Sequence, residues 1–484
     1  MRRAWWRCRA AALALFALAA GCAQHRTVAT PAADVLSASA AQVWITTADQ
    51  SRLLSREPDV AIHPATADAV AVIDVYAAIE YQEMVGFGAA MTDASAQLIQ
   101  RLPDAQRRAI LRELFGRDPG IGLSFVRVPM GSSDFSSRHY SYDDMPAGHV
   151  DSALAHFSIE PDRLEKLPAL QAALAINPHL TLVASPWSAP GWMKTSGSLI
   201  GGTLRPEFHE SFARYISRFV DAYAAEGIPI HAVTLQNEPA FEPTDYPGMR
   251  LDPLARADII GRHLGPRFSR AAVRTRILDW DHNWDQPASP LAVLSDSVAQ
   301  RYVSGVAWHC YAGTVDAQTV VHDAHPTVDT YFTECSGGGW APAFADNLAY
   351  DVGTLIVGAT RGWARGVALW NLALDETGGP HLGGCGNCRG VITIDSRTGM
   401  VTRNVEFYAL AHASRFVRAG ARRIASSTDV RGLRSVAFRN AGDRSKVLIV
   451  LNTGSAAVAL AVRDGDNGFR YEMPAGAVAT MRWR

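Results

Sequence analysis

The chain has 484 residues, of which 48% are hydrophobic and 19% are charged, and its formal net charge at pH 7 is −1. This composition is that of a globular protein long enough for one large domain and a smaller one. A charge so close to neutral gives no electrostatic footprint for nucleic acid or for an acidic polymer, so neither is expected as a partner.

The first 22 residues are predicted to be an export signal. A basic start precedes an apolar stretch at residues 10–20, which has the length of a signal-peptide core and is short for a membrane span. The stretch runs into the sequence Leu-Ala-Ala-Gly-Cys, which resembles a bacterial lipoprotein cleavage site and predicts lipidation of Cys22. We therefore expect an exported protein, periplasmic or at the cell surface, anchored to the outer membrane through Cys22; plain secretion is the alternative. Residues 23–40, rich in Ala, Ser and Thr, are predicted to be a flexible tether.

Both ends of the remaining chain have a strand-rich pattern. Residues 41–80 contain two strand-like segments, Gln42–Thr46 and Val70–Val75. Residues 418–484 consist of short alternating segments separated by turn residues, with no room for helices, which is typical of a β-sandwich. We expect one small sandwich domain built from both ends of the chain.

Residues 81–417 alternate short apolar runs with amphipathic helical stretches. The eight runs are Met84–Gly88, Leu123–Met130, Leu180–Ser185, Ile230–Glu238, Arg276–Asp281, Gly305–Tyr311, Thr330–Cys335 and Val367–Leu374. Between the third and fourth runs, large apolar residues recur every three or four positions from Phe208 to Tyr223, which indicates one face of a helix. Eight strand–helix units predict a (β/α)₈ barrel rather than an open doubly wound sheet.

Four cysteines lie beyond the predicted signal, and export would place them in an oxidising compartment. Cys385 and Cys388 lie in a glycine-rich loop and are predicted to form a small disulfide clip. Cys310 and Cys335 follow apolar runs and are expected to be small buried hydrophobic residues rather than a bonded pair. There is no second Cys-x-x-Cys to complete a zinc site, so no metal is expected.

Two glutamates end apolar runs: Glu238, in the sequence LQNEP, and Glu334, in TECSG. A carboxylate at the end of a buried strand is costly to desolvate unless it has a use, and a barrel brings the carboxyl ends of its strands together. Glycoside hydrolysis requires such a pair, one carboxyl as acid and one as nucleophile. Because proline follows Glu238, we expect this residue to have extended backbone and to project from the end of its strand. Either glutamate alone has a plainer explanation, as a surface charge or a helix-cap partner.

Other polar and aromatic residues end the same runs. A sugar offers hydroxyl groups to polar side chains and CH faces to rings, so this set suits a carbohydrate. Taken singly, a tryptophan at a strand end is more often part of the core, and a buried histidine is more often structural. Arg127 has a structural alternative too, neutralising nearby carboxylates and tuning their pKa.

Six motifs, in one consistent order, resemble those of glycoside hydrolase family 30, the group that contains the glucosylceramidases. They are GFGAAMTD, RVPMGSSDF, ASPWSAPGWMK, NEP, TEC and WNLAL, and the resemblance runs from about residue 80 to the end of the chain. It implies a (β/α)₈ barrel with an attached β-sandwich, hydrolysis with retention of anomeric configuration, and no cofactor.

The resemblance also implies roles for individual residues. Glu238 matches the family's acid/base and Glu334 its nucleophile, while Asn237 would bond the sugar 2-hydroxyl. The predicted substrate-binding residues are Arg127, Asp134, Trp187, Asn237, His309, Tyr311 and Trp370. Since Glu334 must be ionised to attack and Glu238 protonated to release the leaving group, their environments are expected to separate their pKa values, with that of Glu238 the higher.

Two departures from the animal glucosylceramidases concern the aglycone side. The loop at residues 378–390 differs from the loop that those enzymes have at this place, and Cys310 replaces a tryptophan between His309 and Tyr311.

The first prediction for the function is a retaining β-glucosidase whose substrate is a glucosylceramide-like glucoside, either a glycolipid or an oligosaccharide. An endo-β-1,6-glucanase or a β-xylosidase of the same family is the alternative enzyme, and a non-catalytic carbohydrate-binding lipoprotein is the alternative of another class.

Overall fold

The structure is a computed structural model that describes residues 36–65 and 71–484. The predicted signal and Cys22 lie outside the described residues, as does most of the predicted tether. At the start of the described chain Leu36 is buried, and strand β1 (Ala40–Thr46) begins at Ala40. Among the helices of these two ranges, none has both the length and the apolar character needed to cross a bilayer.

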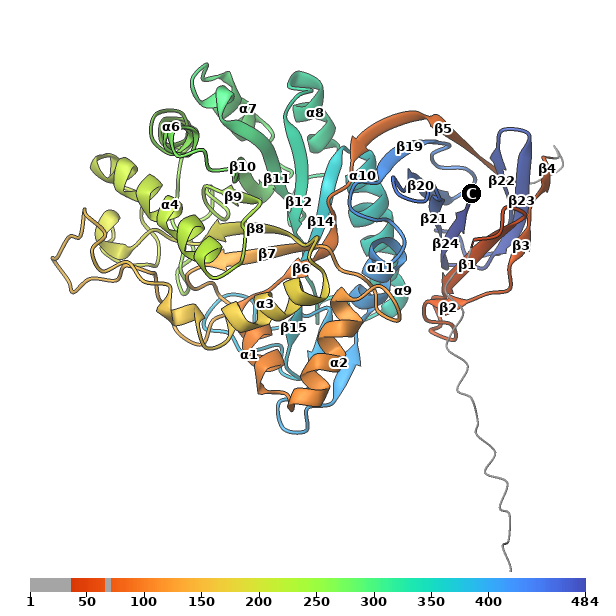
Figure 1. The fold of residues 1–484 in the computed structure, drawn as a ribbon, viewed down its shortest axis with the longest axis horizontal. Helices are drawn as coiled ribbons and strands as arrows, with labels where there is room; N and C mark the ends of the chain where they lie inside the picture. Colours follow the sequence, from red (N-terminus) through yellow and green to blue (C-terminus); the bar gives the residue numbers. More distant parts are fainter. Residues whose placement is uncertain (1–35, 66–70) are drawn as a thin grey trace, which may run out of the picture. The chain divides into compact units, whose positions relative to one another are not determined.

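Eight parallel strands close into a barrel, and strands that follow one another along the chain pair side by side. They are β6 (Gly86–Ala90), β7 (Phe125–Met130), β8 (Thr181–Pro186), β9 (Ala232–Thr234), β10 (Arg276–Asn283), β11 (Val303–His309), β12 (Asp329–Glu334) and β14 (Ala364–Asn371). The predicted (β/α)₈ barrel is confirmed (Figure 1).

The inside of the barrel changes from apolar to polar along its axis. One apolar residue from each strand, or from just before it, forms a closed layer: Val85, Phe125, Val183, Ala232, Leu278, Ala307, Tyr331 and Ala368. Side chains on a strand alternate between its two faces, so the residue two positions further on should also point inward. It does so on six strands, where it is polar or aromatic: Arg127, Ser185, Thr234, His309, Thr333 and Trp370. On β6 and β10 it is Phe87 and Trp280, which pack in the larger apolar cluster outside this layer instead. The carboxyl end of the barrel is therefore lined with hydrogen-bonding groups.

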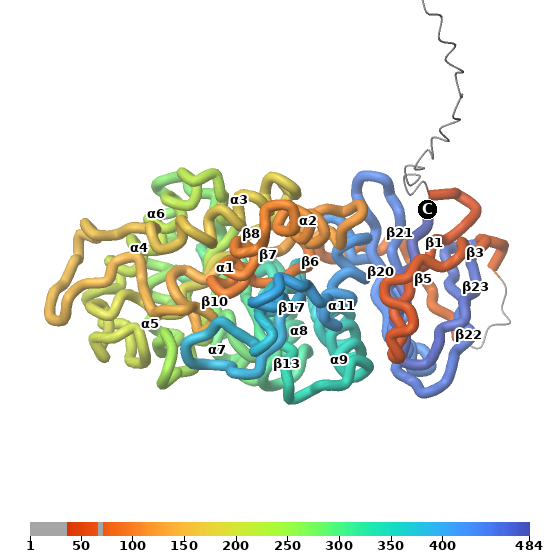
Figure 2. The backbone as a smooth tube through the Cα atoms, turned by 90° about the horizontal axis from the view of Figure 1, so that it is seen from below, coloured from red at the N-terminus to blue at the C-terminus, as the bar shows by residue number. Residues whose placement is uncertain are grey.

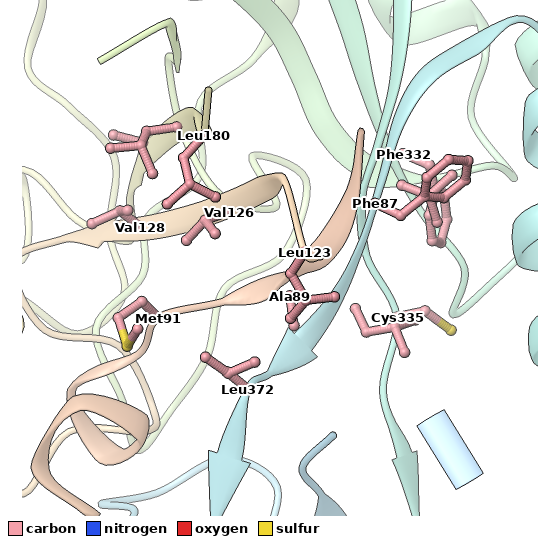
Figure 3. Packing of buried hydrophobic residues seen from close by; sticks show 14 of the residues in the cluster. Phe87, Ala89, Met91, Leu123, Val126, Val128, Leu180, Phe332, Cys335 and Leu372 are labelled. Atoms are coloured by element: carbon pink, nitrogen blue, oxygen red, sulfur yellow. The ribbon is translucent and has the colours of Figure 1, made fainter. Parts of the chain in front are cut away.

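Helices surround the barrel and bury their apolar faces against the strands (Figures 1 and 2). They are α1 (Asp93–Arg101), α2 (Asp104–Phe115), α3 (Lys166–Ile176), α4 (His209–Ala225), α5 (Pro253–Asp258), η4 (Ile259–Leu264), α6 (Gly265–Arg270), α7 (Ala288–Ser295), α8 (Asp316–Ala324), α9 (Phe344–Tyr350), η6 (Asp351–Gly358), α10 (Ala359–Arg361) and α11 (Val405–Ser414). In α4 the predicted apolar face, from Phe212 to Tyr223, is buried. Figure 3 shows part of this outer cluster, including Phe87 of β6 and Phe332 of β12.

The second domain is a sheet made from both ends of the chain, as predicted. Its strands include β5 (Ala71–Glu83), β19 (Arg422–Ser426), β20 (Leu433–Arg439), β21 (Lys446–Asn452), β22 (Val458–Asp464), β23 (Asn467–Met473) and β24 (Val478–Trp483). Strand β1 pairs with β24, and β5 pairs with both β19 and β22. In Figure 1 the red N-terminal strands lie among the blue C-terminal ones.

A buried histidine connects the barrel to this sheet. His412, on α11, has its Nδ1 2.9 Å from the hydroxyl of Thr480 on β24 and its Nε2 2.8 Å from that of Thr46 on β1. The Thr480 hydroxyl donates its proton to the His412 carbonyl, so it accepts from Nδ1–H, and Nε2 accepts from Thr46. Burial lowers the pKa of His412 to about 3, so the imidazole is neutral.

We predict that His412 makes the protein acid-sensitive. Its pKa is about 6.5 in the unfolded chain and about 3 in the folded one, so unfolding takes up a proton between these values. The stability that neutral His412 contributes is complete above pH 6.5 and falls by about 1.4 kcal/mol per pH unit below it. In urea denaturation, the wild type should lose about 2 kcal/mol more than His412→Gln between pH 7 and pH 5. Equal losses would contradict this prediction.

Candidate active site

Arg127, on β7, is fully buried and lies at the centre of the polar end of the barrel. Its Nη1 donates to Glu334, and its Nη2 donates to Asp281 Oδ2 at 2.7 Å and to Asn237 Oδ1 at 2.6 Å. Burial alone would lower the pKa of Arg127, but the charges of Asp281 and Glu334 raise it. The guanidinium is thus a permanent positive charge shared between two carboxylates.

Two tryptophans cover this guanidinium. The Trp187 and Trp370 rings stack with their centroids 5.0 Å apart, and the Arg127 guanidinium carbon lies 4.7 Å and 5.4 Å from them. Cation–π attraction between arginine and tryptophan is strongest where water is excluded, as it is here. The two rings are therefore part of the site and also hold the Arg127 guanidinium in place.

Asp281, on β10, is the second buried charge and accepts several hydrogen bonds. Its donors include the hydroxyl groups of Ser185 at 2.6 Å, Thr234 at 2.8 Å and Thr333 at 2.6 Å, besides Arg127. Burial alone would raise the pKa of Asp281, but Arg127 and the hydrogen bonds hold it well below the usual aspartate value. Asp281 was expected at the end of its strand and had no predicted role, whereas β10 continues to Asn283.

A bulge in β10 explains why Asp281 points inward. Leu278 belongs to the apolar layer, so regular alternation would turn Trp280 toward the site. The pairing with β11 shifts register between Trp280 and His282, and both Trp280 and Asp281 have positive φ, 75° and 59°. The extra residue turns Trp280 outward, against Arg256, and brings Asp281 into the barrel.

Glu334, at the end of β12, is held by two side chains. Besides Arg127, the Tyr311 hydroxyl donates to its Oε1 at 2.9 Å. Thr333 and Glu334 both contact the site although they are consecutive, because the β11–β12 ladder shifts register so that His309 pairs with Glu334. This second irregularity places the carboxylate beside the buried charges.

Glu238 reaches the site from a loop rather than from a strand end. Strand β9 ends at Thr234, and Glu238 has a φ of 47°, so the expected extended backbone before Pro239 is wrong. Two backbone hydrogen bonds account for this conformation: Glu238 N donates to Asp281 O at 3.0 Å, and Phe241 N donates to Glu238 O at 2.9 Å. Such a conformation costs about 1–3 kcal/mol and persists only where surrounding contacts enforce it.

His309 lies between the two glutamates. Its Nδ1 is 3.1 Å from Glu238 Oε1 and 3.9 Å from Glu334 Oε1. Because both oxygens are this near to one nitrogen, they can be at most about 7 Å apart, which is the sum of the two distances. Its Nε2 is 3.0 Å from Asp281 Oδ1, which fixes the plane of the ring. His282 is also near, with Nδ1 3.7 Å from Glu238 Oε1. The sequence analysis did not single out His282.

The pKa values of the two glutamates shift in the opposite directions to those expected. Burial would raise the pKa of Glu238, but its hydrogen bond with His309 and the nearby positive charges lower it. Burial and the charge of Glu238 raise the pKa of Glu334 against the effects of His309 and Arg127. The pKa of His309 rises to about 9, because the surrounding carboxylates outweigh its burial. The expectation left out His309, whose hydrogen bond and positive charge lower the pKa of Glu238.

The loop at residues 378–390 lies against Asp134, which follows β7. Leu382 N donates to the Asp134 carbonyl at 2.8 Å, and Gly384, with a φ of 67°, lies so close to Asp134 that a Cβ would be 2.5 Å from the Asp134 Cβ. Burial and the two glutamates raise the pKa of Asp134 well above its usual value. The loop thus borders the residue predicted to bind the glycone, not only the aglycone side.

The structure contains two disulfides in the described part of the chain. The predicted bond between Cys385 and Cys388 is confirmed. The expectation that Cys310 and Cys335 are separate buried residues is wrong, since they form the second bond. Strands β11 and β12 are neighbours in the barrel and end in register, which brings the two Cα atoms to 5.4 Å.

Two groups of side chains have donor atoms close enough to hold a cation. One is His209, Asp258 and His263 on the outer helices, and the other is Glu238, His282 and His309. In the first group Asp258 and His263 already pair with charged neighbours such as Arg262 and Glu210. The second group coincides with the carboxylate–histidine contact described above. We assign neither a metal nor a cofactor.

Residues 84–417 match the family model of the glycosyl hydrolase family 30 TIM-barrel domain, and residues 420–481 match that of the family 30 beta sandwich domain. The chain is 36% identical over 387 residues to the endo-1,6-beta-D-glucanase of Neurospora crassa, covering 77% of this chain and 79% of the relative. It is 34% identical over 441 residues to the lysosomal acid glucosylceramidase of Mus musculus, covering 84% and 82%. A solved structure of an endo-beta-1,6-glucanase superimposes with a TM-score of 0.84 at 31% identity, covering 92% of this chain and 99% of that one.

We predict that Arg127→Met destabilises the fold as well as the site. The substitution leaves Asp281 and Glu334 buried without their counter-ion, which should lower the free energy of unfolding by about 3–5 kcal/mol. Arg403→Met is the matched control, because Arg403 pairs with Glu113 at a partly exposed position, where an ion pair contributes less than about 1 kcal/mol. Guanidinium chloride denaturation of both variants tests this, and similar losses in the two would contradict it.

Proposed function

The chain belongs to glycosyl hydrolase family 30, and on this premise we propose that it is a retaining β-glycosidase with Glu334 as nucleophile and Glu238 as acid/base. The observation that carries the assignment is the position of both carboxylates around one imidazole nitrogen, within about 7 Å of each other. This bound admits the separation of about 5–5.5 Å of retaining enzymes and also the lower end of the range of about 6.5–9.5 Å of inverting enzymes. Retention is therefore proposed from the family membership, and the pair of carboxylates supports the two catalytic roles.

The reaction takes two steps. A Glu334 oxygen attacks the anomeric carbon while the bond to the leaving oxygen breaks and that oxygen takes a proton from Glu238. A water molecule then attacks the anomeric carbon, Glu238 takes the water's proton, and the bond to Glu334 breaks. Arg127 and Tyr311 hold the Glu334 carboxylate in one orientation and favour its ionised form during the first step.

His309 would supply the proton that Glu238 needs. In this proposal His309 is protonated at first, in keeping with its raised pKa, and its Nδ1 is 3.1 Å from Glu238 Oε1. Asp281 accepts from Nε2, which leaves Nδ1–H directed at Glu238. A bound sugar excludes water from the pair, and removal of water favours the neutral state, in which the proton lies on Glu238 and His309 is uncharged.

Asn237 is oriented to bind the sugar. Its Oδ1 accepts from Arg127 at 2.6 Å, so the amide nitrogen is the group left to donate to a sugar hydroxyl. In this reaction a contact to the 2-hydroxyl strengthens in the transition state. Trp187 and Trp370 add apolar ring surface for the CH faces of the same sugar.

We predict that a 2-deoxy-2-fluoro-β-glucosyl fluoride labels Glu334. The fluorine slows the second step more than the first, so the glycosyl–enzyme accumulates and mass spectrometry of peptides should find it on Glu334. Glu334→Gln should remove both labelling and hydrolysis. Glu238→Gln should lose activity on substrates with poor leaving groups but keep most of its first step on a dinitrophenyl glucoside, which needs no acid. Labelling at another carboxylate would overturn the assignment.

As substrate we propose a β-1,6-linked glucan. Similarity to endo-1,6-glucanases at 36% sequence identity supports this. A groove of about 1080 Å³ lies nearby: its lining includes Pro239 and Ala240, the two residues after Glu238, but neither catalytic glutamate. Its lining includes the polar residues Arg250, Asp252 and Gln286, which suit the hydroxyl groups of a sugar chain beyond the scissile bond. This reverses the order in which the sequence analysis ranked the substrates. Glucosylceramide is the second candidate, supported by the 34% identity to the mouse enzyme.

We predict that a linear β-1,6-glucan yields oligosaccharides and that glucosylceramide is cleaved slowly or not at all. Gln286→Ala should raise KM for the glucan and leave kcat/KM for an aryl β-glucoside unchanged, because none of the residues proposed to hold the cleaved sugar lines the groove. Chromatography of the glucan products and lipid analysis, with Glu334→Gln as the inactive control, test this. Glucose released from the lipid with the glucan untouched would establish the second candidate instead.

A further inference from the structure

We propose that the Cys310–Cys335 disulfide is a positioning element of the active site and that full hydrolytic activity requires it in the oxidised state. The inference rests on the proposed function of Glu334. The bond joins the residue that follows Glu334 to the residue between His309 and Tyr311. Cys310 therefore lies between His309 and Tyr311, which contact the two carboxylates, and Cys335 directly follows Glu334 itself.

The bond extends the barrel ladder at the point where hydrogen bonding stops. The last pair between β11 and β12 is His309 with Glu334, and the disulfide links the two strands one residue beyond it. Cys335 is buried, and its carbonyl accepts from the backbone N of Trp370 at 2.8 Å. The link thus connects β11, β12 and β14 at their carboxyl ends, where the site lies.

Tyr311 is the residue that depends on this link. It is 46% exposed and lies in the segment between β11 and α8, outside any strand or helix. Its hydroxyl nevertheless donates to Glu334 Oε1 at 2.9 Å. Its backbone is tied by the disulfide at Cys310 and by the hydrogen bond from Tyr311 N to Asn283 Oδ1 at 3.0 Å, and its ring packs edge-on against His309. The disulfide is the covalent one of these ties, and without it the segment is no longer bonded to β12, the strand that carries Glu334.

A double-mutant cycle separates positioning from general stabilisation. Loss of a hydrogen bond to a charged group should lower kcat for an aryl β-glucoside about tenfold in Tyr311→Phe. If the disulfide holds this contact, Cys310→Ala/Cys335→Ala alone should cost a similar factor, and adding Tyr311→Phe should cost less than about twofold more. A purely structural bond would change the melting temperature and leave the effect of Tyr311→Phe at tenfold.

Cys385→Ala/Cys388→Ala is the matched control, because it removes the other disulfide of the described chain. In that background Tyr311→Phe should still lower kcat about tenfold, as in the wild type. The control thus separates the effect of losing a disulfide in general from the effect of losing the Cys310–Cys335 bond.

Reduction of the folded protein gives a test that does not depend on the variants folding. Dithiothreitol supplies two electrons and two protons, so Cys310 and Cys335 become thiols and the reagent becomes its cyclic disulfide. The wild type and the Cys385→Ala/Cys388→Ala variant should lose about nine-tenths of kcat, whereas Cys310→Ala/Cys335→Ala should not respond. Full activity after mass spectrometry has shown reduction of Cys310 and Cys335 would overturn the inference. Failure of the proposed function is distinct, because the untreated wild type would then be inactive and Glu334 unlabelled.

Discussion

A fully buried arginine is the constraint on which the site depends. Taking Arg127, Asp281 and Glu334 out of water costs several kcal/mol for each charge, and the fold recovers this only where the geometry is good and the remaining hydrogen bonds are made. The hydroxyl groups that satisfy Asp281 come from β8, β9 and β12, so most of the barrel must be correctly aligned at once. The same alignment holds the Glu334 carboxylate still, and a nucleophile with a fixed orientation loses little entropy when it reacts.

The residues that line the site were largely predictable from the alternation of the strands. Once Phe125 is placed in the apolar layer, Arg127 must face inward above it, and the same step of two leads from Ala307 to His309 and from Ala368 to Trp370. Family motifs added the roles of the two glutamates. Periodicity of this kind is a local property of the chain, so it can be read without knowing which strands are neighbours.

Four features could not be predicted in this way, because each depends on contacts between segments that are distant in the sequence. The bulge that turns Asp281 inward arises where β10 meets β11, and the shift that brings in Glu334 arises where β11 meets β12. The positive φ of Glu238 comes from a hydrogen bond to Asp281, 43 positions along the chain. The Cys310–Cys335 bond likewise requires two strand ends that the sequence leaves 25 residues apart. Sites concentrate such departures from local rules, since chemistry needs side chains where regular strands would not place them.

The pairing of β1 with β24 has a consequence for how the chain is assembled during synthesis. The strand at Ala40–Thr46 leaves the ribosome among the first parts of the described chain, but its partner at Val478–Trp483 is among the last. In the meantime its unpaired edge is open to other chains, a hazard that grows with the waiting time. The barrel, whose strands pair in chain order, is free of this delay and can form before the sheet does. Synthesis from one end to the other therefore makes the sheet the last part of the molecule to close.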